Sequence, residues 1–290
     1  MSKDIDREDL LQAAVLDSLE RVKKLGYTVL FVANYGSHNY NLDIDDEDYV
    51  SDVDTKAIIL PTLRDLVNNS KPISTTLVTR AGQCDVKDIR AFVPTLLKAN
   101  VQFLETLQAQ TCWINPDYEK EFNWFIDHLE ELIAGSKPQL LKSIYGMCLE
   151  KRKAMTHPFP SIKWKIDEWG YDGKQVHHIL RLSDILTRYF EFNKSFEDSI
   201  WYDTDDIRRW FLIQVKKNEF PLEQALKVAD EKCEKIKNKV EFLLESAEKD
   251  ENFDIKKQYE SQAKKIIINN IKKEILEGEN VFNSNTQLQQ

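Results

Sequence analysis

The chain has 290 residues, of which 42% are hydrophobic and 31% are charged, so it can bury a substantial core in one large or two ordinary domains. No apolar run approaches the roughly 18 residues that a membrane-spanning helix needs, so we expect no membrane-spanning segment. The net charge of −9 argues against a protein whose main task is to grip nucleic acid, so any polynucleotide must be held locally or after metal neutralisation.

The chain opens with a predicted helix. Residues 6–25 place apolar side chains at helical spacing, and Gly26 follows where a C-terminal cap belongs. The preceding residues do not combine a positive region with an apolar core, so they show no secretory signal and favour a cytoplasmic protein. The apolar run over residues 27–32 predicts the first strand.

A glycine and a serine follow this strand, and two aspartates lead into the next apolar run, residues 57–60. If Asp52 and Asp54 lie on a strand, its period of two turns both carboxylates to the same face. Mg²⁺ prefers oxygen ligands and commonly takes one or two carboxylates plus substrate phosphates, so this pair suits it. Gly36 lets the backbone turn sharply beside a phosphate, and Ser37 offers a hydroxyl and an amide as donors.

The acidic loop over residues 43–48 offers other carboxylate pairings. Its simplest interpretation is a solvated acidic insertion, because charged side chains are rarely buried. A calcium loop that starts at Asp43 would place Asp48 where the sharp-turn glycine belongs and would lack the terminal glutamate, so it matches poorly. We favour Asp52 and Asp54 because only they enter an apolar, strand-like segment.

The residues around this turn resemble a known family. Gly36-Ser37 followed by Ser51-Asp-Val-Asp54 resembles the signature of the DNA polymerase β nucleotidyltransferase superfamily. The segment Gly36-Ser37-His38-Asn39-Tyr40-Asn41-Leu42 is similar to the Gly-Ser-x-x-Tyr-x-Leu element of its bacterial and phage RNA repair pathway members. The spacing before Ser51 is longer here than in that family. The resemblance implies two Mg²⁺ or Mn²⁺ ions, held by two carboxylates on one strand and a third on a neighbouring strand.

Further strands supply that third carboxylate. A short helix is predicted from residue 61 to 66 or 67, and strands over residues 73–78 and 83–87. By the resemblance, Asp85 corresponds to the third metal ligand. Asp88 is the competitor, but it stands where it would cap the following helix, so we favour Asp85.

The resemblance continues over residues 88–107, with an acidic-apolar-Arg step, a helix, Lys-x-Asn and an apolar helix with an internal glutamate. For Arg90 and Glu105, a buried ion pair and a substrate contact are equally favoured. From residue 119 onward the pattern is helical. For the basic residues 151–153 the two alternatives are a phosphate contact and a solvated basic turn, and we favour the solvated turn.

Residues 170–182 form the second informative stretch. In a helix that begins near Lys174, the side chains of Lys174, His178 and Arg181 share one face. A lysine and an arginine near a helix start are suited to gripping a triphosphate. The family has a Tyr-Asp-x-Lys, His and Arg-Leu pattern here, which implies nucleotide binding by these three residues. His177 is excluded because it points elsewhere on the helix.

Beyond residue 203 we expect mixed-charge helices, and apolar residues 242–244 and 266–268 offer faces for a helix pair or a homo-oligomer. The four cysteines have no zinc spacing and are expected to be buried or idle. The expected fold is α+β, with an N-terminal mixed-sheet nucleotidyltransferase domain over residues 1–110, a mostly α-helical C-terminal domain over residues 111–282, and a frayed tail over residues 283–290.

The expected activity is transfer of a nucleoside monophosphate from an NTP to an acceptor hydroxyl, with release of pyrophosphate. By the resemblance, an RNA or tRNA end is the favoured acceptor. A protein or small-molecule hydroxyl is the alternative within enzymes, and a catalytically silent nucleotide-binding regulatory module is the alternative outside them. The chain lacks the glycine-rich P-loop and dinucleotide patterns and the nucleophile elbow of hydrolases.

Overall fold

The computed structural model describes residues 6–47, 49–246 and 253–287. A five-stranded sheet forms the N-terminal part, with strand order β3-β4-β2-β1-β5. The β2–β4 pair is parallel and the other three pairs are antiparallel. The expected fold class is confirmed, because this mixed sheet is followed by a mostly helical part. The strands are β1 (Thr28–Tyr35), β2 (Asp54–Leu60), β3 (Ser74–Val78), β4 (Gln83–Asp88) and β5 (Cys112–Ile114).

Helix α1 (Arg7–Lys23) closes one face of the sheet. Asp6 caps its first turn, and its apolar stripe, which includes Val15 and Val22, packs against buried β1, β2 and β4 residues. The Ser18 hydroxyl lies 2.7 Å from that of Thr55, which satisfies both groups inside this layer. Because side chains alternate along a strand, the neighbours of Thr55 point to the opposite face.

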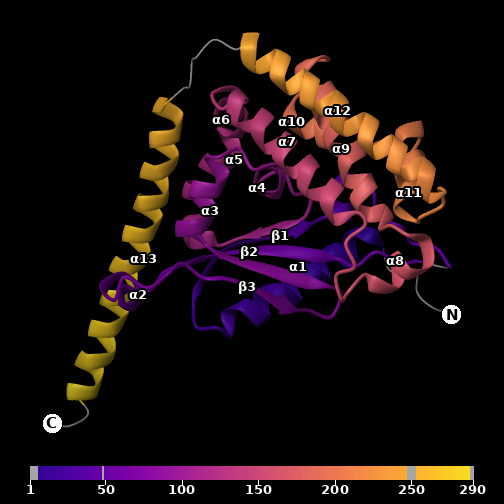
Figure 1. Cartoon of the computed structure of the whole chain (residues 1–290). Coiled ribbons are helices and arrows are strands. Elements are labelled where there is room, and N and C mark those ends of the chain that lie inside the picture. Colours follow the sequence, from indigo (N-terminus) through magenta and orange to yellow (C-terminus); the bar gives the residue numbers. More distant parts are fainter. Residues whose placement is uncertain (1–5, 48, 247–252, 288–290) are drawn as a thin grey trace.

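The opposite face carries the larger core, which continues from the sheet into the helices. Figure 1 shows the helical part over this side of the sheet, with α7, α9 and α12 packed together. The helices after α1 are α2 (Leu63–Val67), α3 (Ile89–Leu96), α4 (Val101–Thr106), α5 (Glu119–Asp127), α6 (Leu129–Ala134), α7 (Lys137–Ala154), α8 (Lys163–Trp169), α9 (Gly173–Phe190), α10 (Phe196–Ile200), α11 (Ile207–Lys216), α12 (Leu222–Ser246) and α13 (Phe253–Gln287), and the short 3₁₀ turns are η1 (Ser37–Tyr40) and η2 (Pro116–Tyr118).

Two segments join the predicted halves of the chain. Strand β5 lies beyond residue 110 and pairs with β1, so the sheet extends past the expected boundary. Helix α13 returns beside the N-terminal part, where the Asn270 side-chain amide donates to the Pro61 carbonyl at 3.2 Å (Figure 1). Ile266 is buried against this chain's own core, whereas Phe242 and Ile268 are exposed. Within the described residues, the helices are too short or too polar to span a bilayer.

Candidate active site

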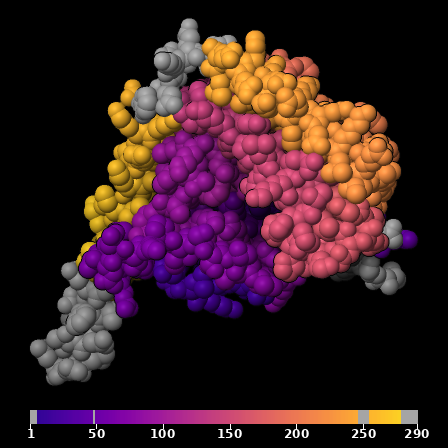
Figure 2. All heavy atoms as spheres, viewed as in Figure 1, coloured from indigo at the N-terminus to yellow at the C-terminus, as the bar shows by residue number. Residues whose placement is uncertain are grey.

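A cavity of about 380 Å³ lies between the sheet and the helical part. Figure 2 shows the surface hollowed where the purple N-terminal surface meets the pink helical surface. The cavity is lined by Tyr35, Gly36, Ser37, Tyr40, Tyr49, Ser51, Asp52, Asp54, Gln102, Lys151, Ile162, Asp172, Lys174, Gln175, His177, His178, Arg181 and Lys216. Seven of the eight residues predicted for the site are therefore in one place, and Asp85 is the exception.

The turn after β1 forms the first wall. Gly36 has φ +82°, a left-handed conformation that L side chains rarely adopt, and it opens the 3₁₀ turn η1. A Cβ on Gly36 would lie 3.9 Å from Oδ2 of Asp54, so this backbone passes directly beside that carboxylate. Ser37 also lines the cavity. The glycine thus brings backbone and hydroxyl donors next to an acidic group.

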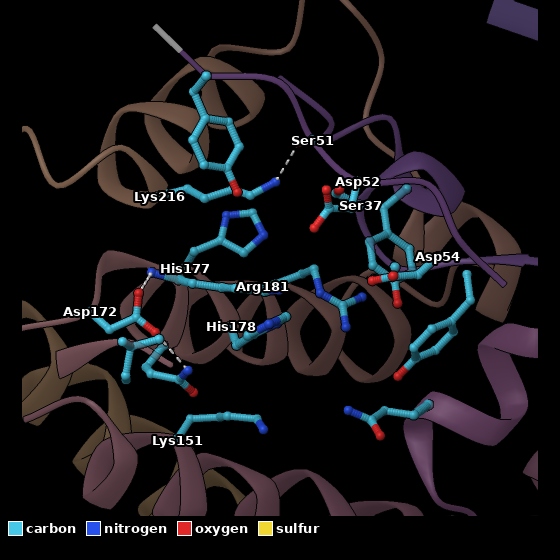
Figure 3. Close-up of a pocket in the computed structure, with 18 residues that line it drawn as sticks. Ser37, Ser51, Asp52, Asp54, Lys151, Asp172, His177, His178, Arg181 and Lys216 are labelled. Carbon is cyan, nitrogen blue, oxygen red and sulfur yellow. Dashed lines mark hydrogen bonds between the residues drawn. The ribbon is translucent and has the colours of Figure 1, made fainter. Parts of the chain in front are cut away.

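Asp52 and Asp54 point into the cavity from the same segment (Figure 3). Only Asp54 lies on a strand, as the first residue of β2, and Asp52 lies in the coil before it. The Gln83 amide donates to Oδ1 of Asp54 at 3.1 Å. Burial raises the pKa of Asp54 and the Asp52 charge adds to this, outweighing the Gln83 amide and the Lys174 charge. The cavity thus holds two neighbouring carboxylates, and carboxylate oxygens are the ligands that hard divalent cations take.

Asp85 lies on β4 opposite Lys56 of β2, in the parallel register of these strands. Its two carboxylate oxygens contact lysines, at 3.7 Å from Lys56 Nζ and 3.0 Å from Lys87 Nζ. Lys56 is itself buried between the rings of Tyr35 and Phe103, and burial lowers its pKa to about 8. Among the described residues, no three potential metal-ligating side chains gather into one cluster. The third carboxylate is thus held by the protein's own cations.

Asp88 caps a helix, and this structural role is the reason it was the weaker candidate for the third metal ligand. It is fully buried and caps α3 by accepting from the Arg90 amide at 2.8 Å. The Arg90 guanidinium also contacts the Asp88 carboxylate, at 2.6 Å, and donates to the Ser70 carbonyl at 3.1 Å. Of the two alternatives for Arg90, the structure places it in an ion pair.

Helix α9 forms the opposite wall. Asp172 caps it by accepting from the Lys174 amide at 3.2 Å, so the helix begins one residue before the predicted start. Lys174 stays exposed at the cavity, near the N-terminal end of the helix dipole. His178 also lines the cavity, but burial, with His177 and Arg181 nearby, holds its pKa well below its usual range. His178 is therefore neutral at pH 7 and offers hydrogen bonds rather than charge.

Arg181 lines the cavity, but its guanidinium already forms an ion pair within the protein. It is 2% exposed and contacts both oxygens of Glu105, at 2.5 and 3.4 Å. Its guanidinium lies 3.9 Å from the centre of the Tyr40 ring, and the Tyr40 hydroxyl donates to Glu105 at 2.8 Å. Glu105 thus forms a buried ion pair with Arg181, and this pair neutralises most of the Arg181 charge.

Two lysines outside the predicted site residues also line the cavity. Lys151 lies in the last turn of α7, rather than in a solvated basic turn, and Lys216 is the last residue of α11. The Lys216 ammonium donates to the Leu42 carbonyl and to the Ser51 hydroxyl, both at 3.2 Å, and burial with Lys174 nearby lowers its pKa to about 8. Figure 3 shows this lysine facing the Asp52 side of the cavity.

His177 also borders the cavity, contrary to the expectation that it points elsewhere. It is 2% exposed, and its Nδ1 lies 3.1 Å from the Leu212 carbonyl of α11. Burial and the Lys216 charge lower its pKa to about 3, so the ring is neutral at pH 7. Adjacent helical residues both border the cavity because the first turns of α9 cross it.

The acidic loop is tied to the protein rather than fully solvated. Asp43 contacts Arg7 at 3.1 Å and the His38 ring at 3.4 Å, and Asp46 contacts Lys217 at 2.8 Å. Asp48 lies outside the described residues. These contacts place Tyr49 at the cavity, with its ring 5.8 Å from the Lys216 ammonium.

No protein-family model matches the sequence, and no curated protein matches it. Among solved structures, the chain is similar to a nucleotidyltransferase-like protein from Exiguobacterium sibiricum 255-15. The two are 12% identical, with a TM-score of 0.29, over 78% of this chain and 73% of that one. A TM-score this low does not establish a common fold, so no residue role follows from it.

Proposed function

We propose that this chain is a metal-dependent nucleotidyltransferase that transfers a nucleoside monophosphate from an NTP to an acceptor hydroxyl and releases pyrophosphate. The observation that carries the proposal is the division of one cavity into two walls. Asp52 and Asp54, beside the Gly36–Ser37 turn, line the cavity together with lysines from three helices: Lys151, Lys174 and Lys216, here called the cationic wall. Figure 3 shows Lys151 across the cavity from Asp52. Such an arrangement suits a substrate that carries both a metal ion and several phosphates.

The residues present fit a divalent ion at Asp52 and Asp54. Two carboxylates from one segment line the cavity beside the Gly36–Ser37 turn, and Mg²⁺ or Mn²⁺ takes such oxygen ligands together with phosphate oxygens. When bound, the ion would neutralise the triphosphate and polarise the reacting oxygens. The two-ion arrangement has Asp85 as the third ligand. It requires the Asp85 carboxylate to leave its ion pairs with Lys56 and Lys87 and to bind an ion instead.

The protein's own contribution is positioning and charge. Lys151, Lys174 and Lys216 approach the cavity from α7, α9 and α11, so they are placed to bind phosphate oxygens from several directions. The Gly36–Ser37 backbone and the Ser37 hydroxyl add neutral donors beside the carboxylates. Positioning and charge neutralisation provide nearly all of the catalysis in phosphoryl transfer, so no further nucleophile is needed.

The acceptor is proposed to be an RNA or tRNA end, on the sequence resemblance. Incubation with Mg²⁺, α-labelled NTPs and either tRNA or a protein extract distinguishes the acceptors. We expect label in RNA and release of pyrophosphate. Label found only in protein would replace the RNA acceptor by a protein hydroxyl. NTP binding without pyrophosphate release, with any acceptor, would favour a silent regulatory module.

Lys174→Ala is expected to weaken binding of a Mg²⁺-bound, non-hydrolysable NTP by about tenfold, because a hydrogen bond to a charged group contributes about 1.5 kcal/mol or more. The lysine is exposed, so thermal stability should change little. Titration calorimetry of both proteins gives the two affinities. Lys163→Ala is the matched control, since Lys163 is an exposed lysine that pairs with Asp167 outside the cavity. Equal affinities in all three proteins would place the triphosphate away from α9.

A further inference from the structure

Two cysteines far apart in the sequence lie side by side in the helical part. The sulfur atoms of Cys148 on α7 and Cys233 on α12 are 2.9 Å apart, although the residues are 85 positions apart in the chain. Non-bonded heavy atoms pack most favourably at about 3.5–4.0 Å, so these sulfurs are in unusually close contact. Both thiols are free in the structure.

The two helices are held in register at this point by a second contact. Arg152 pairs with Asp230 through two hydrogen bonds, at 2.6 and 3.1 Å. Arg152 is one turn after Cys148, whereas Asp230 is one turn before Cys233, so the helices run antiparallel and both contacts belong to one interface. A bond between the sulfurs therefore needs no sliding of α7 along α12.

We propose that Cys148 and Cys233 are a reversible redox pair that forms an intrachain disulfide by exchange with a low-molecular-weight disulfide, such as oxidised glutathione. In the first step a thiolate attacks the reagent, forms a mixed disulfide and releases one reagent thiolate. In the second step the other cysteine loses its proton, attacks the bound protein sulfur and releases the second reagent thiol. In the net reaction two protein thiols are oxidised to one disulfide and one reagent disulfide is reduced to two thiols.

Cys233 is placed to react first. It is half-buried, whereas Cys148 is fully buried, so the reagent reaches Cys233 more easily. The hydrogen bond from Cys148 and the nearby Arg152 charge lower the pKa of Cys233, while that hydrogen bond and burial raise the pKa of Cys148. Cys148 then acts as the resolving thiol, because it already lies against the attacked sulfur.

The bond would close a loop that contains the cationic wall. Lys151, Lys174 and Lys216 all lie between the two cysteines in the sequence, on α7, α9 and α11. A disulfide across a loop of this length restricts the unfolded chain strongly and raises stability. The redox pair thus links the oxidation state of the surroundings to the stability of one wall of the site. The thiol chemistry itself does not depend on the proposed nucleotidyl transfer.

The test uses the full chain with Cys112→Ser, because Cys112 is the exposed cysteine and would otherwise take up glutathione by itself. The folded protein is incubated with oxidised glutathione, and its mass, its free thiols and its cysteine-containing peptides are measured. We expect loss of two thiols per chain, no retained glutathione, and a peptide that joins Cys148 to Cys233. The midpoint of thermal unfolding should rise by about 5 °C and return after treatment with dithiothreitol.

Cys233→Ser in the same background is the matched control, and it should lose no pair of thiols and gain no stability. A glutathione adduct that persists on Cys233 in the parent would overturn the proposal, since Cys148 would then fail to resolve it. So would a linked peptide that forms only in denaturant, or an absence of any thiol loss. Cys84→Ser gives a second check, because this buried sheet cysteine should not affect the reaction.

Discussion

Asp54→Asn is expected to lower nucleotidyl transfer by about a thousandfold or more. Asparagine keeps the size of the side chain and its acceptor for the Gln83 amide, but it removes the charge that would hold the ion. A catalytic metal contributes several kcal/mol to the transition state, and each 1.36 kcal/mol is about a factor of ten in rate. Single-turnover transfer with Mg²⁺ and labelled NTP measures the loss.

Thermal stability should not fall in the same variant. The pKa of Asp54 is raised in the folded protein, mainly by burial, so the folded state binds this proton more tightly than the unfolded chain does. Stability therefore decreases as the pH rises from the unfolded pKa through the folded one, and at pH 7 the ionised carboxylate is a cost. Asparagine removes that cost, so the melting temperature at pH 7 should be equal or higher.

Asp45→Asn is the matched control, because Asp45 is an exposed aspartate of the acidic loop that does not line the cavity. Its activity should equal that of the unaltered protein, whereas Asp52→Asn should behave like Asp54→Asn. Full activity in both cavity variants would show that the ion is held elsewhere. A loss of activity that parallels a loss of structure would instead assign a structural role.

The elements around the site could be predicted because their signals are local. Apolar runs indicated β1 and β2, β-branched composition indicated β3, and the cap at Asp88 indicated the start of α3 directly after β4. β5 is three residues long, and only its pairing with β1 makes it a strand. The turn at Gly36 could also be predicted from a local signal, because a left-handed backbone conformation favours glycine.

The partners of the charged residues could not be predicted, because they depend on contacts between distant parts of the chain. Helical spacing placed Arg181 on the cavity face of α9, but nothing local pairs it with Glu105, 76 residues earlier. The Lys216 ammonium contacts the site by donating a hydrogen bond to the hydroxyl of Ser51, 165 residues earlier. Asp85 was correctly placed on a strand, yet only the register of β4 with β2 sets it opposite Lys56.

Glu105→Gln is expected to destabilise the protein by about 3–5 kcal/mol, because it leaves the buried Arg181 guanidinium without its counter-charge. Glutamine has nearly the same shape as glutamate and still accepts from the Tyr40 hydroxyl. The lost stability therefore comes from the missing charge and not from an empty space in the core. Urea unfolding followed by circular dichroism measures the change. Asp230→Asn breaks a largely exposed arginine pair and should cost less than about 1 kcal/mol.

The double variant Glu105→Gln with Arg181→Met separates a structural role for Arg181 from nucleotide binding. Replacing both charges removes the unpaired cation, so most of the lost stability should return. If the pair only supports the fold, the double variant will bind a non-hydrolysable NTP as the unaltered protein does. If Arg181 also contacts the triphosphate, stability will recover while NTP affinity stays about tenfold weaker. A double variant as unstable as Glu105→Gln would contradict the buried-charge explanation, because the unpaired guanidinium is then no longer present.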